Sequence, residues 1–340
     1  MPNFRKSQHF FDNSNILGHK LFMMKVSILV PVYGVEKYIE KCAVSLFEQS
    51  YEDIEYIFVN DCTPDRSIEV LRGTIAHYPQ RQKQVVIIDH DVNRGLGAAR
   101  HTATEAATGE LVMHVDSDDY LMPHAVEHLC AKMEETGADM VDGGYVTVTA
   151  DRESALIPPF HGTKEKYLKL MLCQNIVFNR IWGRIYRRAL FTEGGINSVE
   201  GINYGEDYVV VPRLILGAKR ACLDEAVYAY RDDNATSYTH SINEKHNRSL
   251  YKAHAIVNEY FTQHDTHGTY RTAMQMAMLA MVRHARRYEG HFRNLDDLCP
   301  IEMKGCAPKL CNAILRSPRI PFSLANFLYL TLRRLYSTTL

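Results

Sequence analysis

The sequence predicts an α/β fold in which a mostly parallel sheet carries helices on both faces, followed by a C-terminal helical region. Two observations support this prediction. In the first half of the chain, short and nearly continuous apolar runs alternate with segments whose apolar residues recur at helical spacing. Beyond about residue 240, only the helical spacing continues. Strands that are apolar along their whole length are typical of a sheet covered on both faces.

The first half contains four predicted strand–helix pairs. The first strand, KVSILVPVY, precedes a segment with Tyr38, Ile39, Cys42 and Leu46 at helical spacing. The fourth helix begins with Pro123, and proline is tolerated in the first turn of a helix. The predicted strands are residues 25–33, 54–59, 85–88 and 111–115, and the predicted helices are residues 36–49, 67–76, 98–107 and 123–135.

After about residue 150 the alternation ends. Helices are expected at 164–172 and 206–216, a strand at 223–230, and then helices at 241–263, 268–288, 307–316 and 320–336. We therefore expect three parts: a disordered lead at 1–24, an α/β domain at 25–240 and a helical region at 241–340. Met23 and Met24 stand just before the first strand, so the sequence leaves open whether translation starts at Met1 or at one of these two residues.

Composition excludes several classes of protein. The chain has 340 residues, 46% of them hydrophobic, and a formal net charge of −1. No basic stripe with interleaved aromatic residues occurs, so we expect no nucleic-acid partner. The eight cysteines lack the paired spacing of a zinc site or a secreted scaffold. Together with the missing apolar core of a secretory signal, this favours reduced thiols in a cytoplasmic protein.

One apolar segment near the C-terminus has two interpretations. Residues 320–332 are too few for the roughly 20 apolar residues that a membrane span needs. Arg319, Arg333 and Arg334 flank the segment, so it could lie flat on an anionic membrane surface, at the inner face of the cytoplasmic membrane. The alternative is a terminal helix packed on its own protein.

Polar residues cluster where each predicted strand ends. These clusters are residues 31–33, 60–61, 89–95 and 116–119. In open α/β sheets, ligands bind outside the carboxyl ends of the strands. Four strand ends that carry polar residues therefore indicate a binding site at this edge of the sheet.

Asp116 and Asp118 follow the fourth strand in the stretch MHVDSDDYL. Residues i and i+2 of an extended segment point the same way, so both carboxylates can face one cation. Mg²⁺ or Mn²⁺ prefers such oxygen ligands and completes its shell with water and substrate phosphates. The alternative is an Asp-rich turn that only solvates its carboxylates. Asp119 is expected to cap the helix that follows.

Two further motifs are weak. Residues 93–100, NRGLGAAR, resemble a dinucleotide-binding loop, but Arg100 replaces the third glycine and the motif follows the third strand. Arg100 could instead meet a phosphate or fix an acidic residue. His124 and His128 belong to an H-x-x-E-H pattern that is known from inverted zinc peptidases, but no third ligand is identifiable.

Gly205-Glu206-Asp207-Tyr208 opens the helix expected at 206–216. Acidic residues are favoured at helix N-termini by the helix dipole, which accounts for them without any chemistry. A carboxylate within hydrogen-bond reach of a sugar hydroxyl could also serve as a general base. Both interpretations remain open on the residues alone.

Three stretches, taken in order along the chain, resemble the family 2 glycosyltransferases with the GT-A fold, a Rossmann-like sheet. The first begins VSILVPVYG and runs to residue 67, the second is NRGLGAARHTATEAATGELVMHVDSDD, and the third is GEDYVVVPRLI. The resemblance covers about residues 25–235 and implies an inverting glycosyltransferase of the bacterial surface-polysaccharide type.

The resemblance also implies roles for individual residues. Pro31, Tyr33 and Asp61 would bind the nucleotide base and ribose, and Asn93 and Arg100 would line the donor site. Asp116 and Asp118 match the D-x-D motif, which contacts the ribose and the metal–diphosphate. Asp207 matches the catalytic base.

The sequence departs from the family pattern in the loop after the second strand. The loop reads NDCTPD where N-D-G-S-T-D is common, so Cys62 and Pro64 make the turn stiffer. Trp182 lies in NRIWGRIYRR, which resembles the W-x-K-L-Y region of bacterial members. Trp182 and Glu206 are candidate acceptor contacts, and a core anchor is the alternative for Trp182.

We therefore expect transfer of a sugar from a nucleotide-sugar, most simply a UDP-sugar, to a hydroxyl of a saccharide or lipid-linked saccharide acceptor. A divalent metal, Mn²⁺ or Mg²⁺, would assist. Two alternatives remain: an NAD-type nucleotide-binding oxidoreductase on the same sheet class, and a member of the family that binds nucleotide-sugar without catalysis. Surface-polysaccharide assembly as the setting depends on analogy with the family.

Overall fold

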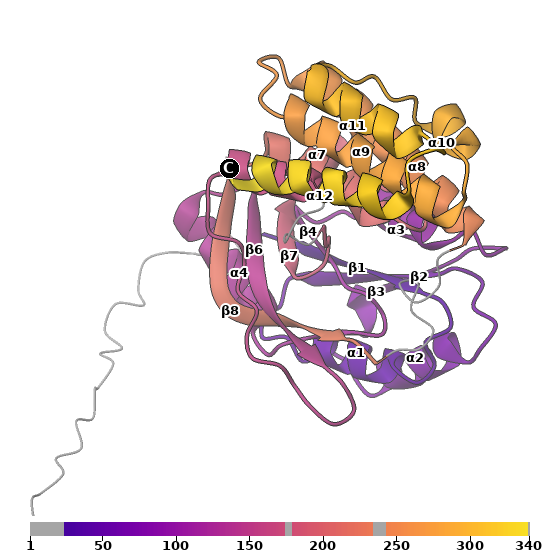
Figure 1. Ribbon diagram of the computed structural model, residues 1–340. Helices are drawn as coiled ribbons and strands as arrows, with labels where there is room; N and C mark the ends of the chain where they lie inside the picture. The colour runs from indigo at the N-terminus through magenta and orange to yellow at the C-terminus, as the bar shows by residue number, and fades with distance from the viewer. Residues whose placement is uncertain (1–23, 174–178, 234–242, 339–340) are drawn as a thin grey trace, which may run out of the picture.

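The computed structural model describes residues 24–173, 179–233 and 243–338. Its centre is one eight-stranded sheet with strand order β3-β2-β1-β4-β7-β6-β8-β5 (Figure 1). The predicted lead at 1–24 falls almost entirely outside the described residues, as does the predicted boundary near residue 240.

Four parallel strands form one half of the sheet, as predicted. They are β1 (Val26–Val32), β2 (Ile54–Asn60), β3 (Val85–Asp89) and β4 (Leu111–His114). All seven residues of β1 are buried, which explains why its sequence is apolar except for Ser27. The crossover helices are α1 (Ile39–Phe47), α2 (Ser67–Ala76) and α3 (Leu96–Ala106).

The other half of the sheet is mixed. Strand β7 (Arg184–Arg187) runs antiparallel between β4 and β6 (Met140–Val148). Strand β8 (Arg220–Arg231) is parallel to β6, and the short β5 (Tyr120–Leu121) closes the edge. Neither β6 nor β7 is apparent in the sequence, because β6 carries the buried Asp142 and two glycines, and both strands bury charged side chains that ion pairs neutralise.

Nine further helices are described. Four belong to the first 220 residues: α4 (Ala125–Thr136), α5 (Lys164–Leu172), α6 (Ala189–Thr192) and α7 (Glu206–Gly217). Five follow: α8 (Glu244–His264), α9 (Arg271–Tyr288), α10 (Arg293–Leu298), α11 (Cys306–Arg316) and α12 (Phe322–Thr338). The predicted helical C-terminal region is confirmed; only the short α6 and α10 were not expected.

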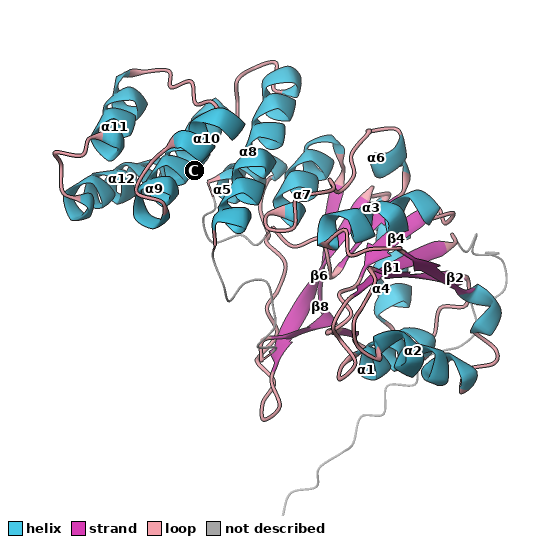
Figure 2. Cartoon of the chain, turned by 90° about the vertical axis from the view of Figure 1, so that its right-hand side faces the viewer, coloured by secondary structure: helices cyan, strands magenta, loops and turns pink. Residues whose placement is uncertain are grey.

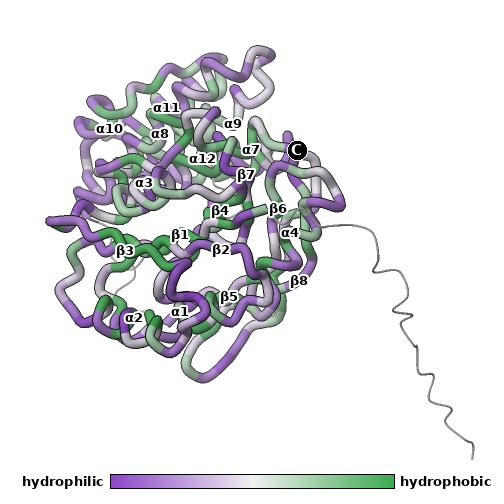
Figure 3. The backbone as a smooth tube through the Cα atoms, turned by 180° about the vertical axis from the view of Figure 1, so that it is seen from behind, coloured by the Kyte–Doolittle hydropathy of each residue, from purple (hydrophilic) through white to green (hydrophobic). Residues whose placement is uncertain are grey.

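Two apolar cores lie on opposite faces of the sheet. Ile28 and Val30 of β1 join one core with α1, α2 and α4, whereas Leu29 joins the other with α3, α5 and α7. The second core continues without interruption into α8 and α9, so the C-terminal helices stack beyond α3 and α7 (Figures 1 and 2). Figure 3 shows the hydrophobic stretch of β1 in the middle of the molecule. Among the described residues, no helix has both the length and the apolar character required to cross a lipid bilayer.

Candidate active site

Three elements bring the predicted site residues together at the carboxyl edge of the parallel strands. The segment after β4 carries Asp116, helix α3 carries Arg100, and the N-terminus of α7 carries Glu206 and Asp207. The pairing of β4 with β1 ends at His114. The carboxylates that follow are therefore outside the β1–β4 ladder. These residues lie up to 107 positions apart in the chain.

Arg100 is the centre of this cluster. Its side chain is 2% exposed, and its Nη2 donates to Asp116 Oδ1 at 2.7 Å. Its Nη1 donates to Glu206 Oε1 at 3.1 Å and also to Asp207. Burial alone would lower the pKa of Arg100, but the three carboxylates, Asp207 foremost, raise it well above its ordinary value. Of the two roles expected for Arg100, fixing an acidic residue is confirmed.

Asp207 and Glu206 are carboxylic acids in a site that disfavours their charge. Burial raises the pKa of Asp207, and Asp116 adds repulsion, against the attraction of Arg100. Burial and the charge of Asp207 raise the pKa of Glu206 to about 8. The N-terminus of α7 favours negative charge, but burial outweighs it here. Asp207 Oδ2 also accepts a hydrogen bond from the backbone N–H of Ile181 at 3.2 Å, which fixes its orientation.

The three aspartates after β4 have different surroundings. Asp116 keeps 24% of its side chain exposed, and one of its oxygens accepts from Arg100. Asp118 is half-buried. Asp119 is buried, and its oxygens accept from Tyr228 Oη at 2.8 Å and from the backbone N–H of Arg231 at 2.7 Å. The prediction that Asp119 caps the following helix is therefore wrong, because α4 starts only at Ala125.

The donor set fits a divalent cation held jointly with a substrate. Among the residues that the structure describes, no group of three or more His, Cys, Asp or Glu side chains is placed to hold a metal. Mg²⁺ and Mn²⁺ commonly use only one or two protein carboxylates and take the remaining ligands from phosphates and water. Asp116 and Asp118 supply that number of hard oxygen ligands, and neither side chain is fully buried.

Asp61 shapes the loop that carries Asn93. Its Oδ1 accepts from Arg94 N at 2.8 Å and lies 2.7 Å from His90 Nδ1, and its Oδ2 accepts from Gly95 N at 2.7 Å. Asp61 is 2% exposed, so in this structure both carboxylate oxygens serve the loop. Asn93 itself is exposed, so its side chain is accessible to a ligand.

Pro31 and Tyr33 lie on either side of the end of β1. Pro31 is buried within the strand, whereas the Tyr33 ring is 47% exposed just beyond it. The neighbouring loop is constrained, since Cys62 has a positive φ of 54°. Asp65 Oδ1 accepts from the hydroxyl of Thr63 at 2.7 Å, and its Oδ2 accepts from Glu36 N at 3.0 Å. The contacts that Pro31, Tyr33 and Asp61 are expected to make with a nucleotide remain predictions.

Trp182 is packed against protein aromatics. Its ring stacks on Tyr228 and Tyr230, with centroids 4.5 Å and 5.2 Å away, and meets the edge of Tyr145 at 5.1 Å. Only 9% of the residue is exposed. This packing is that of a core anchor. Little of the Trp182 ring face is left for a sugar, and its role as an acceptor contact stays a prediction.

The H-x-x-E-H pattern receives no support from the geometry. The rings of His124 and His128 stack at 5.9 Å, and each pairs with a different neighbour. His124 Nδ1 lies 3.0 Å from Ser50 Oγ, and His128 Nδ1 lies 2.7 Å from a Glu225 carboxylate oxygen. Both histidines are exposed, His128 on α4 and His124 at the residue just before it.

Comparison of the sequence with known proteins identifies the family. The model of "Glycosyl transferase family 2" matches residues 27–195. The chain is 34% identical over 216 residues to the uncharacterized glycosyltransferase EpsJ of Bacillus subtilis, covering 61% of each protein. The chain belongs to glycosyl transferase family 2. It is also 28% identical over 218 residues to the poly(ribitol-phosphate) beta-N-acetylglucosaminyltransferase TarS of Staphylococcus aureus, covering 61% of this chain and 35% of TarS.

A solved structure shows the same fold over nearly the whole chain. S. aureus TarS 1–349, in complex with UDP-GlcNAc, superposes with a TM-score of 0.61 at 19% identity, covering 93% of this chain and 90% of that one. The predicted GT-A fold with added C-terminal helices is therefore confirmed. The chain spans less than two thirds of the length of EpsJ and about a third of TarS.

Several residues that build this family 2 site were not found from the sequence. Ser249 of α8 accepts from the backbone N–H groups of Asn203 and Tyr204 at 3.0 and 3.1 Å and so holds the turn that leads into α7. Asn203 in turn accepts from Gly97 N at 3.1 Å. Tyr228 donates to Asp119 and accepts from Asp116 N at 3.0 Å. A lone serine, asparagine or tyrosine carries no periodic signal, so only the fold identifies these roles.

Proposed function

We propose that this protein is an inverting glycosyltransferase that moves a sugar from a UDP-sugar to a hydroxyl of a saccharide or lipid-linked saccharide acceptor. The main support is one observation: Arg100 holds the expected base, Asp207, and the expected D-x-D residue, Asp116, on the same guanidinium. Relatives named as glycosyltransferases, and a fold neighbour crystallised with UDP-GlcNAc, support the same function. TarS is named as a transferase that acts on poly(ribitol-phosphate), a polymer, which suggests surface-polysaccharide assembly as the setting.

In this proposal, Asp207 accepts the proton of the acceptor hydroxyl. The acceptor oxygen forms a bond to the anomeric carbon while the bond from that carbon to the diphosphate oxygen breaks, so UDP leaves and the configuration inverts. A base works best when its pKa lies near the working pH, and burial moves the pKa of Asp207 upward in that direction. Arg100 keeps a share of the Asp207 population ionised.

Asp116 and Asp118 would hold the divalent metal, Mn²⁺ or Mg²⁺. When bound, the metal neutralises the charge that develops on the departing diphosphate. Pro31, Tyr33 and Asp61 would bind the base and ribose of the donor, and Asn93 and Arg100 would line the donor site.

Glu206 is a neighbouring carboxyl with which Asp207 can be compared directly. It shares the guanidinium of Arg100 with Asp207, and its pKa is raised to about 8, so it is a second carboxyl of the kind a base requires. We assign Glu206 to the acceptor side and Asp207 to the base. Asp207→Asn and Glu206→Gln remove one ionisable group each at neighbouring positions, so they form a matched pair.

The test is UDP release with a panel of UDP-sugars and acceptors, with and without EDTA. Loss of a general base costs about 10²–10⁴-fold in rate, so Asp207→Asn should lose turnover and keep UDP binding. Equal release by wild type and Asp207→Asn would show that Asp207 is not the base. Loss of turnover in Glu206→Gln alone would assign the role of base to Glu206.

Tight binding of NAD⁺ without UDP binding, by titration calorimetry, would favour the oxidoreductase alternative. UDP-sugar binding without any turnover would favour a non-catalytic member.

We also propose that the C-terminal helices contact an anionic membrane surface, where a lipid-linked acceptor would be held. Leu310 of α11 and Leu324, Phe327 and Leu335 of α12 are between 50% and 64% exposed. The exposed Arg334 adds positive charge beside this apolar stripe. Sedimentation with phosphatidylglycerol vesicles should recover the wild type and not Phe327→Ser/Leu335→Ser. Equal recovery of both would contradict this contact.

This placement would put the protein at the inner face of the cytoplasmic membrane. All eight cysteines are free thiols in the structure, which is consistent with a reducing compartment.

A further inference from the structure

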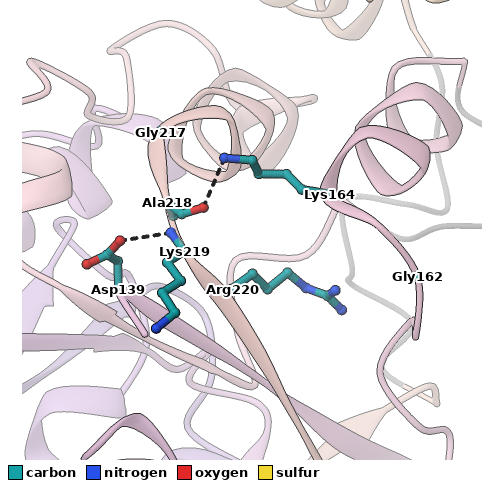
Figure 4. Close-up of a pocket in the computed structure, with 7 residues that line it drawn as sticks. All are labelled: Asp139, Gly162, Lys164, Gly217, Ala218, Lys219 and Arg220. Carbon is teal, nitrogen blue, oxygen red and sulfur yellow. Dashed lines mark hydrogen bonds between the residues drawn. The ribbon is translucent and has the colours of Figure 1, made fainter. Parts of the chain in front are cut away.

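A polar cavity lies at the opposite edge of the sheet from Arg100. Strands β6 and β8 run in the same direction as β4, so their first residues mark the edge remote from Asp116. The cavity has a volume of about 450 Å³, within the range of small-ligand pockets. It is lined by Asp139, Gly162, Lys164 and residues 217–220, and we call it the α5–β8 cavity (Figure 4).

The protein behind this cavity holds more buried positive than negative charge. Asp142 is 1% exposed and accepts from Arg180 at 3.1 Å, from Arg184 at 2.9 Å and from Arg220 at 3.2 Å. Burial alone would raise the pKa of Asp142, but Arg184 and the other two arginines hold it well below its usual range. One carboxylate therefore faces three guanidinium groups, each at most 7% exposed. Carbonyl groups and the Tyr167 ring, whose centroid lies 4.2 Å from the Arg220 guanidinium, stabilise part of this charge, and a bound anion would offset the rest.

Arg220 connects this cluster to the cavity. Its side chain is 6% exposed, and one amino group donates to Asp142 and to the carbonyl of Phe160. Its Nε is buried and has no hydrogen-bond partner among the described residues. A buried donor without a partner costs about 1–3 kcal/mol, so it marks a position where an acceptor is missing. Figure 4 shows Arg220 extending from the start of β8 toward the Gly162 segment, below Lys164.

The remaining polar groups leave this space positive. Lys164 Nζ donates to the carbonyls of Leu216 and Ala218 at 3.0 and 3.3 Å, which neutralises the C-terminal end of α7. The Asp139 carboxylate accepts from Lys219 N at 2.8 Å, and its other oxygen lies 3.7 Å from Arg187 Nε, so its negative charge is already paired. Lys219 Nζ donates to the carbonyl of Thr136 at 2.6 Å, away from the cavity centre.

The start of α5 adds to the positive potential. Lys164 is the first residue of this nine-residue helix, whose first N–H groups lack intrahelical acceptors. The Thr163 side chain accepts from Lys166 N and so satisfies one of them.

We propose that the α5–β8 cavity binds one phosphate-class oxyanion, either inorganic phosphate or the terminal group of a small phosphate monoester. Its oxygens would accept from Arg220 Nε, from Lys164 Nζ and from the first backbone N–H groups of α5. A tetrahedral oxyanion matches these donors, because it offers several acceptors in different directions. The site does not depend on the proposed transferase activity.

The proposed site is distinct from the transferase site. Helix α7 begins at Glu206 beside Arg100 and ends at Gly217 in the cavity lining. Its 12 residues span roughly 18 Å, so a phosphate at one end cannot touch a nucleotide at the other. Phosphate and UDP should therefore bind together without competition.

The experiment is calorimetric titration of the full chain with sodium phosphate, at constant ionic strength in chloride, with and without saturating UDP. We expect one site that UDP does not displace. Lys164→Gln and Arg220→Lys should each weaken phosphate binding about tenfold or more, because each removes a charged hydrogen bond. Lys166→Gln, which removes an exposed charge from the same helix outside the cavity lining, should bind like the wild type.

Arg220→Lys keeps the positive charge beside Asp142, and circular dichroism checks its folding. Lys164 is exposed, so its variant gives an independent measurement if Arg220→Lys is unfolded. Titration with glycerol phosphate beside inorganic phosphate distinguishes an esterified ligand from the free ion. Absence of saturable binding, displacement by UDP, or equal loss in Lys166→Gln and Lys164→Gln would each overturn the proposal.

Discussion

Arg100 offers the sharpest test of how the carboxylate cluster is held together. We consider Arg100→Met, which keeps a long side chain and removes the guanidinium. In the wild type, one buried cation faces three carboxylates, at 2.7 Å from Asp116, 3.1 Å from Glu206 and within hydrogen-bond distance of Asp207. In the variant, Asp116, Glu206 and Asp207 lose their shared cation, and only repulsion remains between their charges.

The expected cost follows from burial. Removing one partner of a buried ion pair costs about 3–5 kcal/mol, because the remaining charge is left uncompensated. The carboxylates keep 15–24% of their side chains exposed, and solvent screens part of their repulsion, so we expect the lower half of that range near pH 8.

The loss should also depend on pH. Without the guanidinium, burial and repulsion raise the folded-state pKa values of Glu206 and Asp207 further above their unfolded values. Such groups destabilise the fold as pH rises through the raised pKa, so the loss should be smaller at pH 5 than at pH 8.

Urea titrations at pH 5 and pH 8 measure both quantities, with the fluorescence of Trp182, the only tryptophan, as a probe beside far-ultraviolet circular dichroism. Arg94→Met is the matched control, because Arg94 pairs with Glu200 at the surface and such pairs contribute little. A loss below about 1 kcal/mol at pH 8, or equal losses at both pH values, would refute the charge argument for Arg100.

Three further predictions concern Glu206, Gly95 and Ser249, with Gly73 of α2 as a contrast for Gly95. The folded-state pKa of Glu206, about 8, lies above its ordinary 4.5, so wild-type stability should fall between pH 5 and pH 8 by up to about 1.4 kcal/mol per unit. Glu206→Gln should flatten this profile in urea titrations, and parallel profiles would contradict the shift. Gly95→Ala should lose about 1 kcal/mol or more and weaken UDP binding, because φ is +88° and the new Cβ would lie 2.1 Å from Asn203 Nδ2. Gly73→Ala, in the open helix position of α2, should instead stabilise by about 0.5–1 kcal/mol by thermal unfolding. Ser249→Ala should cost about 1–3 kcal/mol and lower turnover more than UDP affinity, whereas unchanged turnover would show that the turn before α7 needs no support.

The parallel half of the fold was predictable because its signals are local. Each of β1, β2 and β4 is a mostly apolar and mostly buried run, and the polar residues that follow them mark the site edge. Strands β6 and β7 gave no such signal. Asp142 and Arg184 are buried there as partners in an ion-pair cluster, and partners 42 residues apart are invisible to a pattern read along the chain.

The sequence predicted which residues belong to the candidate site, but it did not predict which of their side chains contact each other. Asp116 and Asp207 were identified by their motifs, and Arg100 was expected to meet either a phosphate or an acid. That Arg100 joins both aspartates depends on how α3 and α7 pack, which no short-range pattern reports. Asp119 was misplaced for a similar reason, since its partner Tyr228 lies 109 residues away.

The hydroxyl of Ser249 has a practical consequence for engineering. A hybrid that joins residues 1–240 to the tail of another relative would lose the clamp on the turn before Asp207, even though every residue of the sheet edge were kept. Specificity swaps in this protein should therefore exchange loops within the first 240 residues and leave α8 in place. The contact of Ser249 with the turn before α7 therefore limits which substitutions α8 can accept, independently of any partner of the C-terminal helices.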